Sequence, residues 1–267
     1  MVRIYTLGTS HGDSTFARFN SSTVYEVSDG TLYLLDAGAP VEALLRRKGL
    51  RAQRLRAGFI THMHDDHAGG LTGLIKQIIK YPGERVLPFT LHLPEERAIG
   101  ALKGWFSALH EDADHALLAY RAVDDGVVYE DEHLHVTAIR TQHLRTRGRT
   151  EGDPCSFAYV LHFKQENRVI LHTGDLRSDF ADFPQIALEQ HFDACLCEAT
   201  HYQPEDSHDL LMNARFDRLI FIHIADRWHK VLEGGWRVRD GERDLLAHCA
   251  DFPYPVRVAH DGDEFEV

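Results

Sequence analysis

The chain has 267 residues, of which 43% are hydrophobic and 26% are charged, a composition typical of a globular protein with a sizeable core. No apolar run is long enough to span a bilayer, and the amino terminus enters a strand-like stretch without the apolar segment of a signal peptide, so we expect a cytoplasmic protein that makes no membrane contact. The net charge of −12 argues against a long nucleic acid as partner, because nucleic acids are bound by broad basic surfaces.

Short strands open the chain and alternate with helices further along it. Runs of β-branched and aromatic residues between polar turns predict the strands, and apolar residues at helical spacing predict the helices. The expected strands are 2–8, 22–27, 31–38, 56–62, 88–93, 134–141, 155–163, 168–175, 193–200, 218–224 and 255–267. The expected helices are 40–48, 67–80, 95–122, 180–191, 205–214 and 240–250. This order favours one domain, 1–267, of the α/β (α+β) class, with two sheets sandwiched between outer helices.

The stretch THMHDDHAGG concentrates metal-ligand side chains at the junction between an expected strand and an expected helix. His62 and His64 are two positions apart at the strand end, so both imidazoles can point the same way. Asp66 and His67 open the helix, where the chain turns and a second pair of ligands can face the same space. Imidazole nitrogen and carboxylate oxygen are ligands of zinc and related metals. The stretch therefore predicts a metal site.

The pattern His-x-His-x-Asp-His resembles the signature of the metallo-β-lactamase superfamily, and later motifs of that superfamily follow in order. Asp36 in LLDAG resembles the early aspartate that supports the site, whereas His143 in IRTQHL, Asp175 in LHTGDL and His223 in IFIHIADRW resemble metal ligands. Asp65 has no ligand role in this pattern, and we expect it to face solvent at the helix start. The resemblance implies a four-layer αββα sandwich. It also implies one metal held by His62, His64, His143 and Asp175, and a second held by Asp66, His67, Asp175 and His223.

The resemblance implies a dinuclear metal-dependent hydrolase. Two divalent ions held close together can share a bridging hydroxide as nucleophile and can neutralise charge on an anionic substrate. Asp66 is expected to orient or deprotonate that water in addition to binding metal. Histidine and aspartate suit Zn²⁺, Mn²⁺ and iron alike; Zn²⁺ is our first expectation, with Mn²⁺ or Fe as alternatives.

Several stretches resemble the ribonuclease Z-like branch, namely TLGTS and NSSTVYEV near the start, CEAT at 197–200, FIHIADRW and VAHDGDEFEV. Two departures argue against tRNA processing. Only 32 positions separate His143 from Asp175, which leaves no room for the long arm with which that branch grips tRNA. Cys197 replaces the histidine of the motif His-Glu-Ala-Thr, a residue associated with proton transfer. The resemblance therefore favours arm-less relatives, which include phosphodiesterases acting on small cyclic phosphates or nucleotides.

Substrate contacts are expected from a short basic loop and from residues near the carboxyl-terminal motifs. Arg145, Arg147 and Arg149 follow a ligand strand, where guanidinium groups can clamp a phosphate; the alternative is a solvated charged loop. Arg227 in IADRW is a further candidate for phosphate contact. His201, directly after Glu-Ala-Thr, is a candidate catalytic proton relay, and an exposed loop histidine is the alternative.

The leading hypothesis is a phosphodiesterase that acts on a small phosphodiester or a cyclic nucleotide, so the expected partner is a small anionic substrate. The alternatives are hydrolysis of a lactone, thioester or other carboxylic ester on the same metals, and a tRNA 3′-processing endonuclease. A non-catalytic metal-binding protein with the same fold is the remaining alternative. Relatives of this kind are often dimers, which leaves a homodimer open.

Overall fold

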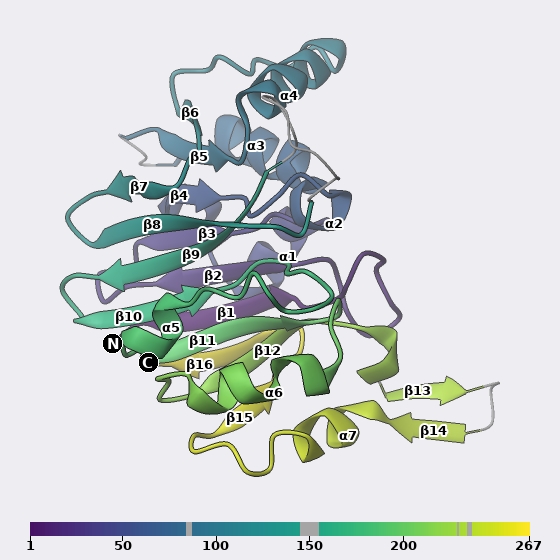
Figure 1. Ribbon diagram of the computed structural model, residues 1–267. Coiled ribbons are helices and arrows are strands. Elements are labelled where there is room, and N and C mark those ends of the chain that lie inside the picture. Colours follow the sequence, from purple (N-terminus) through teal and green to yellow (C-terminus); the bar gives the residue numbers. More distant parts are fainter. Residues whose placement is uncertain (84–86, 145–154, 229, 234–236) are drawn as a thin grey trace.

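Two seven-stranded sheets lie face to face in the computed structural model, which describes residues 1–83, 87–144, 155–228, 230–233 and 237–267 (Figure 1). The first sheet contains, in spatial order, β16 (Asp263–Glu266), β1 (Arg3–Gly8), β2 (Ser22–Glu26), β3 (Leu32–Leu35), β4 (Leu55–Phe59), β5 (Phe89–Leu93) and β6 (Leu118–Ala122). The second contains β15 (Val256–Val258), β12 (Leu219–Ile224), β11 (Ala194–Ala199), β10 (Arg168–His172), β9 (Ser156–Phe163), β8 (Leu134–Thr141) and β7 (Gly126–Glu130). A separate hairpin pairs β13 (Lys230–Glu233) with β14 (Arg237–Asp240).

Helices cover the outer faces of both sheets (Figure 1). The helices are α1 (Val41–Lys48), α2 (Asp65–Ala68), α3 (Leu71–Lys80), α4 (Glu96–Ala108), α5 (Ile186–Glu189), α6 (Pro204–Asn213) and α7 (Gly241–Ala247), with short 3-10 turns η1 (Ala52–Arg54) and η2 (Asp226–Trp228). In the described part of the chain, no helix combines the length and the apolar composition needed to cross a bilayer. The predicted four-layer αββα arrangement is confirmed.

The alternation of side chains along the strands divides the apolar interior into layers. Tyr25, Phe59 and Phe163 belong to the cluster between the two sheets. Opposite faces of the same sheets pack against helices, as Leu34 does beneath α1 and α3 and Leu171 does beneath α6. The outer strands β6 and β7 keep exposed side chains, whereas the central strands of each sheet are buried on both faces between their ends.

The metal-ligand motifs lie at those ends. The strands β3, β4 and β5 run parallel, as do β10, β11 and β12, and β8 has the direction of β10 because β9 is antiparallel to both. Carboxyl ends of strands with the same direction meet at one edge of a sheet, which is where α/β proteins place their ligands. The topology thus brings loops that are far apart in sequence together at one edge of the sheets.

Two predicted helices are shorter in the structure. The helix expected over 95–122 ends at Ala108, where His110 has a left-handed backbone (φ 58°), and residues 118–122 form β6 instead. Pairing with the edge of β5 satisfies backbone groups of that segment, so tertiary contacts outweigh its helical pattern. The helix expected over 180–191 is confined to Ile186–Glu189, and Phe180, where it was expected to begin, has a left-handed backbone (φ 56°).

The predicted strand over 255–267 is divided between the two sheets. A turn with Gly262 in the left-handed region (φ 88°) separates β15, which pairs with β12, from β16, which pairs with β1. This crossing ties the carboxyl terminus to both layers. The strand β7 and the β13–β14 hairpin were not predicted, because their sequences lack a long run of alternating apolar residues.

Candidate metal centre

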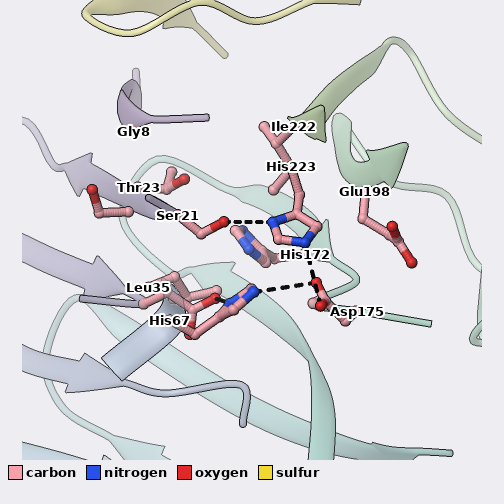
Figure 2. Close-up of a pocket in the computed structure, with 13 residues that line it drawn as sticks. Gly8, Ser21, Thr23, Leu35, His67, His172, Asp175, Glu198, Ile222 and His223 are labelled. Atoms are coloured by element: carbon pink, nitrogen blue, oxygen red, sulfur yellow. Dashed lines mark hydrogen bonds and ion pairs between the residues drawn. The ribbon is translucent and has the colours of Figure 1, made fainter. Parts of the chain in front are cut away.

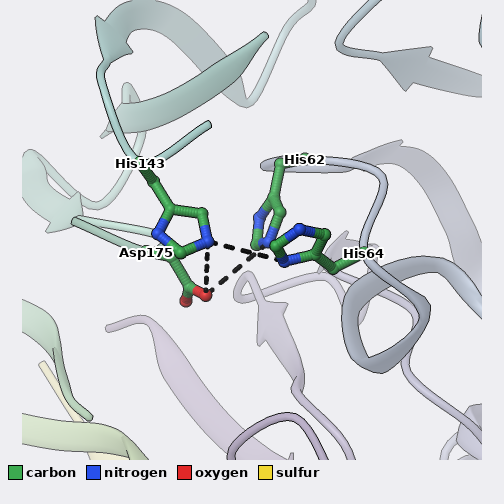
Figure 3. Close-up of side chains that lie close together, drawn as sticks. All are labelled: His62, His64, His143 and Asp175. Carbon is green, nitrogen blue, oxygen red and sulfur yellow. Dashed lines mark hydrogen bonds and ion pairs between the residues drawn. The ribbon is translucent and has the colours of Figure 1, made fainter. Parts of the chain in front are cut away.

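Four predicted ligands from three strand ends form the first cluster (Figure 3). His62 and His64 follow β4, His143 follows β8 and Asp175 follows β10, and one donor atom from each lies within 4.8 Å of the others. The Nε2 atoms of His62 and His143 each lie 3.6 Å from Oδ2 of Asp175. The Nε2 atom of His143 lies 3.4 Å from Nδ1 of His64. The structure therefore brings together the set predicted for one metal.

Three further predicted ligands, Asp66, His67 and His223, form a second cluster next to the first. Figure 2 shows His67 and His223 together with Asp175. The Nε2 atom of His67 lies 3.3 Å from Oδ2 of Asp66. Asp175 also faces this cluster, with Oδ1 3.3 Å from His67 Nε2 and Oδ2 3.4 Å from His223 Nε2. Asp175 thus lies between the two clusters, as expected of a shared ligand. Asp65 is exposed in the first turn of α2, also as expected.

Asp36 and Thr61 hold the rings of the histidine motif in place. The Oδ2 atom of Asp36 lies 2.7 Å from Nδ1 of His67, and its Oδ1 accepts a hydrogen bond from the Thr61 backbone N–H at 2.8 Å. The hydroxyl of Thr61 lies 3.1 Å from Nδ1 of His62. A partner on Nδ1 fixes the tautomer and directs Nε2 towards a metal. Asp36 occupies the supporting position predicted for it.

Two other ligands are oriented in the same manner by partners that the sequence did not identify. The Ser21 hydroxyl lies 2.8 Å from Nδ1 of His223. The carbonyl oxygen of Leu176 lies 3.3 Å from Nδ1 of His143. Each partner comes from a segment distant in sequence from its histidine, so no local pattern indicates it.

Three backbone positions around the clusters are left-handed. Asp36 (φ 58°) and His223 (φ 50°) adopt a conformation that is uncommon for residues other than glycine, and Gly174 (φ 58°) precedes Asp175. A Cβ on Gly174 would lie 2.8 Å from the Phe157 carbonyl oxygen, so glycine is required there. Backbone strain of this kind concentrates at functional sites, where the surrounding structure holds it.

Burial and the charges of neighbouring side chains determine which ligands of the two clusters are protonated. Burial lowers the pKa of His62 well below its usual range and also lowers the pKa of His64, so both rings are neutral and able to bind metal. Burial disfavours the charged form of Asp175, but His223 and His67 outweigh it and hold the pKa of that carboxyl well below its usual range. His62, His64 and Asp175 are therefore in the protonation state that binds a cation at neutral pH.

His67 differs from its neighbours. Burial lowers its pKa, but the negative charges of Asp175 and Asp36 outweigh burial and raise the pKa of His67 well above its usual range. In the metal-free protein this ring therefore carries a proton between two carboxylates. A metal that binds at Nε2 replaces this proton, so binding is expected to release a proton.

The donor atoms fit divalent metal ions. Within the described residues, His67 Nε2 and Asp175 Oδ1 are buried and face each other at 3.3 Å, whereas His62 Nε2 is buried without a hydrogen-bond partner. Leaving a buried polar atom such as His62 Nε2 unsatisfied costs about 1–3 kcal/mol, a penalty that a bound cation would remove. Tetrahedral coordination with bonds of about 2.1 Å places donors about 3.4 Å apart, close to the 3.3–3.6 Å measured between Asp175 and its four histidine neighbours.

His201 lies at the rim of both clusters. Its Nδ1 is 2.9 Å from Oε1 of the fully buried Glu198, and its Nε2 is 3.7 Å from Oδ2 of Asp175. Together with Asp175 and His223 it forms a third group of potential metal ligands. Burial lowers its pKa, but the hydrogen bond and charge of Glu198 outweigh burial and raise the pKa of His201 to about 9. In the metal-free protein the ring is therefore charged at neutral pH, and its Nε2 is directed into the site.

Cys197 faces away from the clusters. It lies next to Glu198 on β11, and its Sγ atom is 3.4 Å from the Tyr202 hydroxyl, within the apolar layer beneath α6 and α7. Alternation along a strand places neighbouring side chains on opposite faces, so Glu198 and not residue 197 faces the metal ligands. The Cys197 side chain therefore contributes no group to the site.

The predicted arginines are only partly placed. Arg145, Arg147 and Arg149 lie outside the described residues. The Nη2 atom of Arg227 donates hydrogen bonds to the carbonyl oxygens of Thr200, at 3.1 Å, and Tyr202. Arg227 therefore holds the chain segment around His201, and its proposed phosphate contact stays a prediction.

Asp182 links two ligand-bearing segments, and the sequence did not single it out. Its Oδ2 accepts a hydrogen bond from the Gln142 backbone N–H at 2.6 Å, and its Oδ1 accepts one from the Arg177 backbone N–H at 2.9 Å. Gln142 precedes His143, and Arg177 follows Asp175 by two positions. Because Asp182 lies 40 residues from Gln142, only the folded chain reveals this bridge.

We expect Asp182→Ala to lower metal affinity roughly 10- to 100-fold, the usual loss when a supporting residue of a metal site is removed. The physical reason is that His143 and Asp175 lose their common anchor. Competition with a chelating dye measures the affinity. The exposed neighbour Asp179 provides the control, because it contacts the Arg177 side chain and the Ala181 backbone N–H but neither of the two backbone N–H groups that Asp182 binds. Equal affinities in the two variants would show that the bridge has no role in positioning ligands.

Comparison with known proteins agrees with this geometry. Residues 2–213 match the family model described as Anti-Pycsar protein Apyc1. Ribonuclease Z of Salinibacter ruber is 33% identical over 144 residues, which span 53% of this chain and only 44% of that relative. The metallo-β-lactamase fold protein YhfI from Bacillus subtilis aligns over 100% of both chains, with a TM-score of 0.73 and 15% identity. Human tRNase Z, short form, aligns over 99% of both chains, with a TM-score of 0.72 and 19% identity. The predicted metallo-β-lactamase fold and the likeness to ribonuclease Z are confirmed.

Proposed function

The chain belongs to the Anti-Pycsar protein Apyc1 family, and from this premise we propose that it is a dinuclear metal-dependent phosphodiesterase acting on a small phosphodiester or a cyclic nucleotide. The observation that carries the proposal is the position of Asp175, whose Oδ1 faces His67 and whose Oδ2 faces His62. We propose Zn²⁺ as the resident metal, with Mn²⁺ or Fe as alternatives. One ion would be held by His62, His64, His143 and Asp175, and the other by Asp66, His67, Asp175 and His223.

A bound pair of divalent ions supplies a nucleophile at neutral pH and neutralises the charge of a phosphate. Asp66 is proposed to accept or orient the proton of the attacking water. Burial disfavours the charged form of Asp66, but its contact with His67 outweighs burial and lowers the pKa of Asp66. Its carboxylate is therefore ionised and available as a proton acceptor at neutral pH.

His201 is proposed to donate a proton to the departing oxygen of the substrate. Glu198 accepts the hydrogen bond of its Nδ1, which leaves Nε2 directed towards Asp175. A charged imidazole at this place can both stabilise negative charge and supply the proton that a leaving alkoxide requires. The position of His201 in the sequence predicted this role, and the contact with Glu198 supports it by orienting the ring.

In the metal-free protein we expect the ring of His201 to titrate near pH 9, as NMR of the histidine ring protons would measure. Because the folded-state pKa lies above the ordinary value of about 6.5, the protonated form is the one stabilised. The stabilisation from the His201–Glu198 pair is complete below pH 6.5 and is lost as the pH rises through 9. Glu198→Gln is expected to move this titration back towards the ordinary value. A ring that titrates at or below 6.5 in the unmodified protein would contradict the assignment.

The proposed partner is a small anionic substrate, and the proposed location is the cytoplasm. The acidic net charge of −12 and the short separation between His143 and Asp175 both support a small substrate over a long nucleic acid. The ribonuclease Z relatives favour a second candidate, a tRNA 3′-processing endonuclease. This chain matches less than half of the length of the Salinibacter relative, so the activity of that whole protein is carried over only as a proposal.

A panel of substrates tests the proposal. The metal-reconstituted protein is incubated with bis(p-nitrophenyl) phosphate, a cyclic nucleotide, a lactone, a thioester and precursor tRNA, with His64→Ala as the control. We expect turnover of the two small diesters and a large loss in the variant. Lactone or thioester turnover without diester turnover would replace the proposal with carboxylic ester hydrolysis. Efficient tRNA cleavage would favour the second candidate. Metal binding without turnover of any substrate would indicate a non-catalytic protein.

A further inference from the structure

An open cavity lies at the edge of the sandwich where the two sheets end. Strand β6 is the last strand of the first sheet and β7 is the last strand of the second, and both lie at the same end of the molecule (Figure 1). The cavity has a volume of about 490 Å³, a size typical of sites that bind a small organic ligand. Its lining comes from β5, β6, β7 and the turn between the last two strands. None of the seven predicted metal ligands lines it, so the cavity is separate from the metal centre.

A buried histidine forms part of the cavity wall. His92 is 2% exposed, and neither of its ring nitrogens has a hydrogen-bond partner among the described residues. Aromatic contacts hold the ring instead: it stacks on Phe59 with 4.8 Å between ring centroids and contacts Tyr129 edge-on at 5.4 Å. Buried polar atoms normally bind a protein group, an ordered water or a ligand. We therefore expect a bound molecule to reach this ring through the cavity.

An arginine lies beside His92 in the same wall. The parallel register places Arg121 of β6 next to His92 of β5, so both side chains project from the same face of the sheet. Nη1 of Arg121 donates to the Tyr120 carbonyl oxygen at 2.8 Å, and among the described residues Arg121 forms no ion pair. Burial, together with the charge of Arg121, lowers the pKa of His92 to about 4, so the ring is neutral at pH 7 and offers one N–H donor. A guanidinium next to an imidazole N–H can bind an oxyanion.

The acidic side chains of the cavity already have cationic partners. Asp124 and Asp125 form ion pairs with Arg140, at 2.7 and 3.3 Å, and Glu130 forms one with Lys164 at 3.2 Å. In the part of the chain that the structure describes, no group of potential metal ligands includes a residue of this cavity. The arrangement therefore favours an anion over a cation as the ligand.

The remaining wall limits the charge and the shape of that anion. Three carboxylates line the cavity, and they would repel a phosphate with two negative charges more strongly than a carboxylate with one. Val127, which is 63% exposed, and Val128 supply apolar surface on β7. The cavity therefore suits a monocarboxylate with a small apolar body.

We propose that the cavity between β6 and β7 binds a small carboxylic acid, with its carboxylate held by Arg121 and His92 and its apolar body against β7. The planar guanidinium matches the geometry of a carboxylate, and the imidazole N–H adds a further hydrogen bond. Binding gives a partner to a buried ring nitrogen that otherwise has none. The site is distinct from the metal clusters and does not depend on the proposed function.

Fluorine NMR with 4-fluorobenzoate as the probe tests the site in the metal-reconstituted protein at pH 7. We expect saturable binding, accompanied by shifts of the His92 ring nitrogen signals in ¹⁵N-labelled protein. Arg121→Gln should weaken binding at least roughly 10-fold, the usual effect of losing a hydrogen bond to a charged group, with the metal content unchanged. His92→Phe, which keeps an aromatic ring against Phe59, should weaken binding by a similar factor. Arg47→Gln, at an exposed arginine of α1 that does not line the cavity, should bind as the unmodified protein does.

Neutral and doubly charged probes define the ligand class. The neutral analogue 4-fluorobenzamide should bind at least roughly 10-fold more weakly than the carboxylate. Absence of saturable binding, equal affinity for the two probes, or equal affinity of Arg121→Gln and Arg47→Gln for the carboxylate would overturn the site. Tighter binding of 4-fluorophenyl phosphate would overturn the assignment of a carboxylate. A probe bound only by the metal ions would leave the His92 signals unchanged and would dissociate when the metal is removed, which would also overturn the site.

Discussion

Asp175→Ala is expected to lower the diesterase activity more than about 100-fold and to reduce the amount of tightly bound metal. Its carboxylate is 3% exposed and lies within 3.6 Å of the Nε2 atoms of four histidines. Because loss of a supporting residue alone typically lowers activity 10- to 100-fold, loss of a ligand shared by two ions should exceed that range. Initial rates on bis(p-nitrophenyl) phosphate and elemental analysis of the same samples provide the measurement.

The neighbouring motif offers a matched control for this variant. Asp65 belongs to the same dense stretch as the ligands, but its side chain is exposed and no described ligand group includes it. Asp65→Ala should keep its metal and most of its activity. Comparable losses in both variants would mean that the motif tolerates no change of charge, and the separate role of Asp175 would be refuted.

Glu198→Ala is expected to lower the free energy of unfolding by about 3–5 kcal/mol, the usual cost of removing one member of a buried charged pair. The Glu198 carboxylate is fully buried. It accepts hydrogen bonds from the backbone N–H groups of Leu176 (2.9 Å), Thr200 (2.8 Å) and His201 (3.1 Å). Alanine leaves these donors without an acceptor and leaves the charge of the His201 ring unpaired. Equilibrium denaturation in urea measures the loss, provided that the unfolding is two-state.

Glu205 on α6 provides the comparison, because it is exposed and seven positions away in sequence. Glu205→Ala should change the free energy of unfolding by less than about 0.5 kcal/mol. Should Glu198→Ala unfold with the same midpoint as Glu205→Ala, the hydrogen bonds of Glu198 would contribute no net stability. The activities of the folded Glu198→Ala and Glu205→Ala variants are then compared. A lower activity in Glu198→Ala alone would show that Glu198 also orients His201.

The sequence was most informative where the chemistry is local. His62, His64, Asp66 and His67 lie within six residues, so spacing alone indicated that they share a site. The more distant ligands were identified through resemblance to a known family and not through local pattern. Their assembly depends on the topology of two sheets, which gathers the carboxyl ends of strands at one edge.

Residues that act through tertiary contacts were missed. Ser21 and Asp182 carry no signal of their own, because a serine before a strand and an aspartate in a polar stretch are common. Cys197 illustrates the same limit: its alignment with a histidine gave no indication of its direction, and its side chain lies in the helical layer. Packing decides on which face of a strand a side chain is buried, and a short sequence motif contains no information about that packing.

The errors in secondary structure have a similar origin. Residues 118–122 have a helical pattern of apolar side chains, but the open edge of β5 offers hydrogen bonds that a surface helix would not use. The carboxyl-terminal stretch resembles one strand because its turn contains a single glycine, Gly262. In both segments the partner strand, and not the intrinsic preference, decides the conformation.

The central claim is that two ligand clusters sharing Asp175 hold two divalent ions. Elemental analysis of the unmodified protein, after reconstitution with excess Zn²⁺ and removal of free metal by gel filtration, tests it most directly. We expect two ions per chain, with proton release on binding because His67 gives up its proton. A chain that retains one ion or none under these conditions would contradict it.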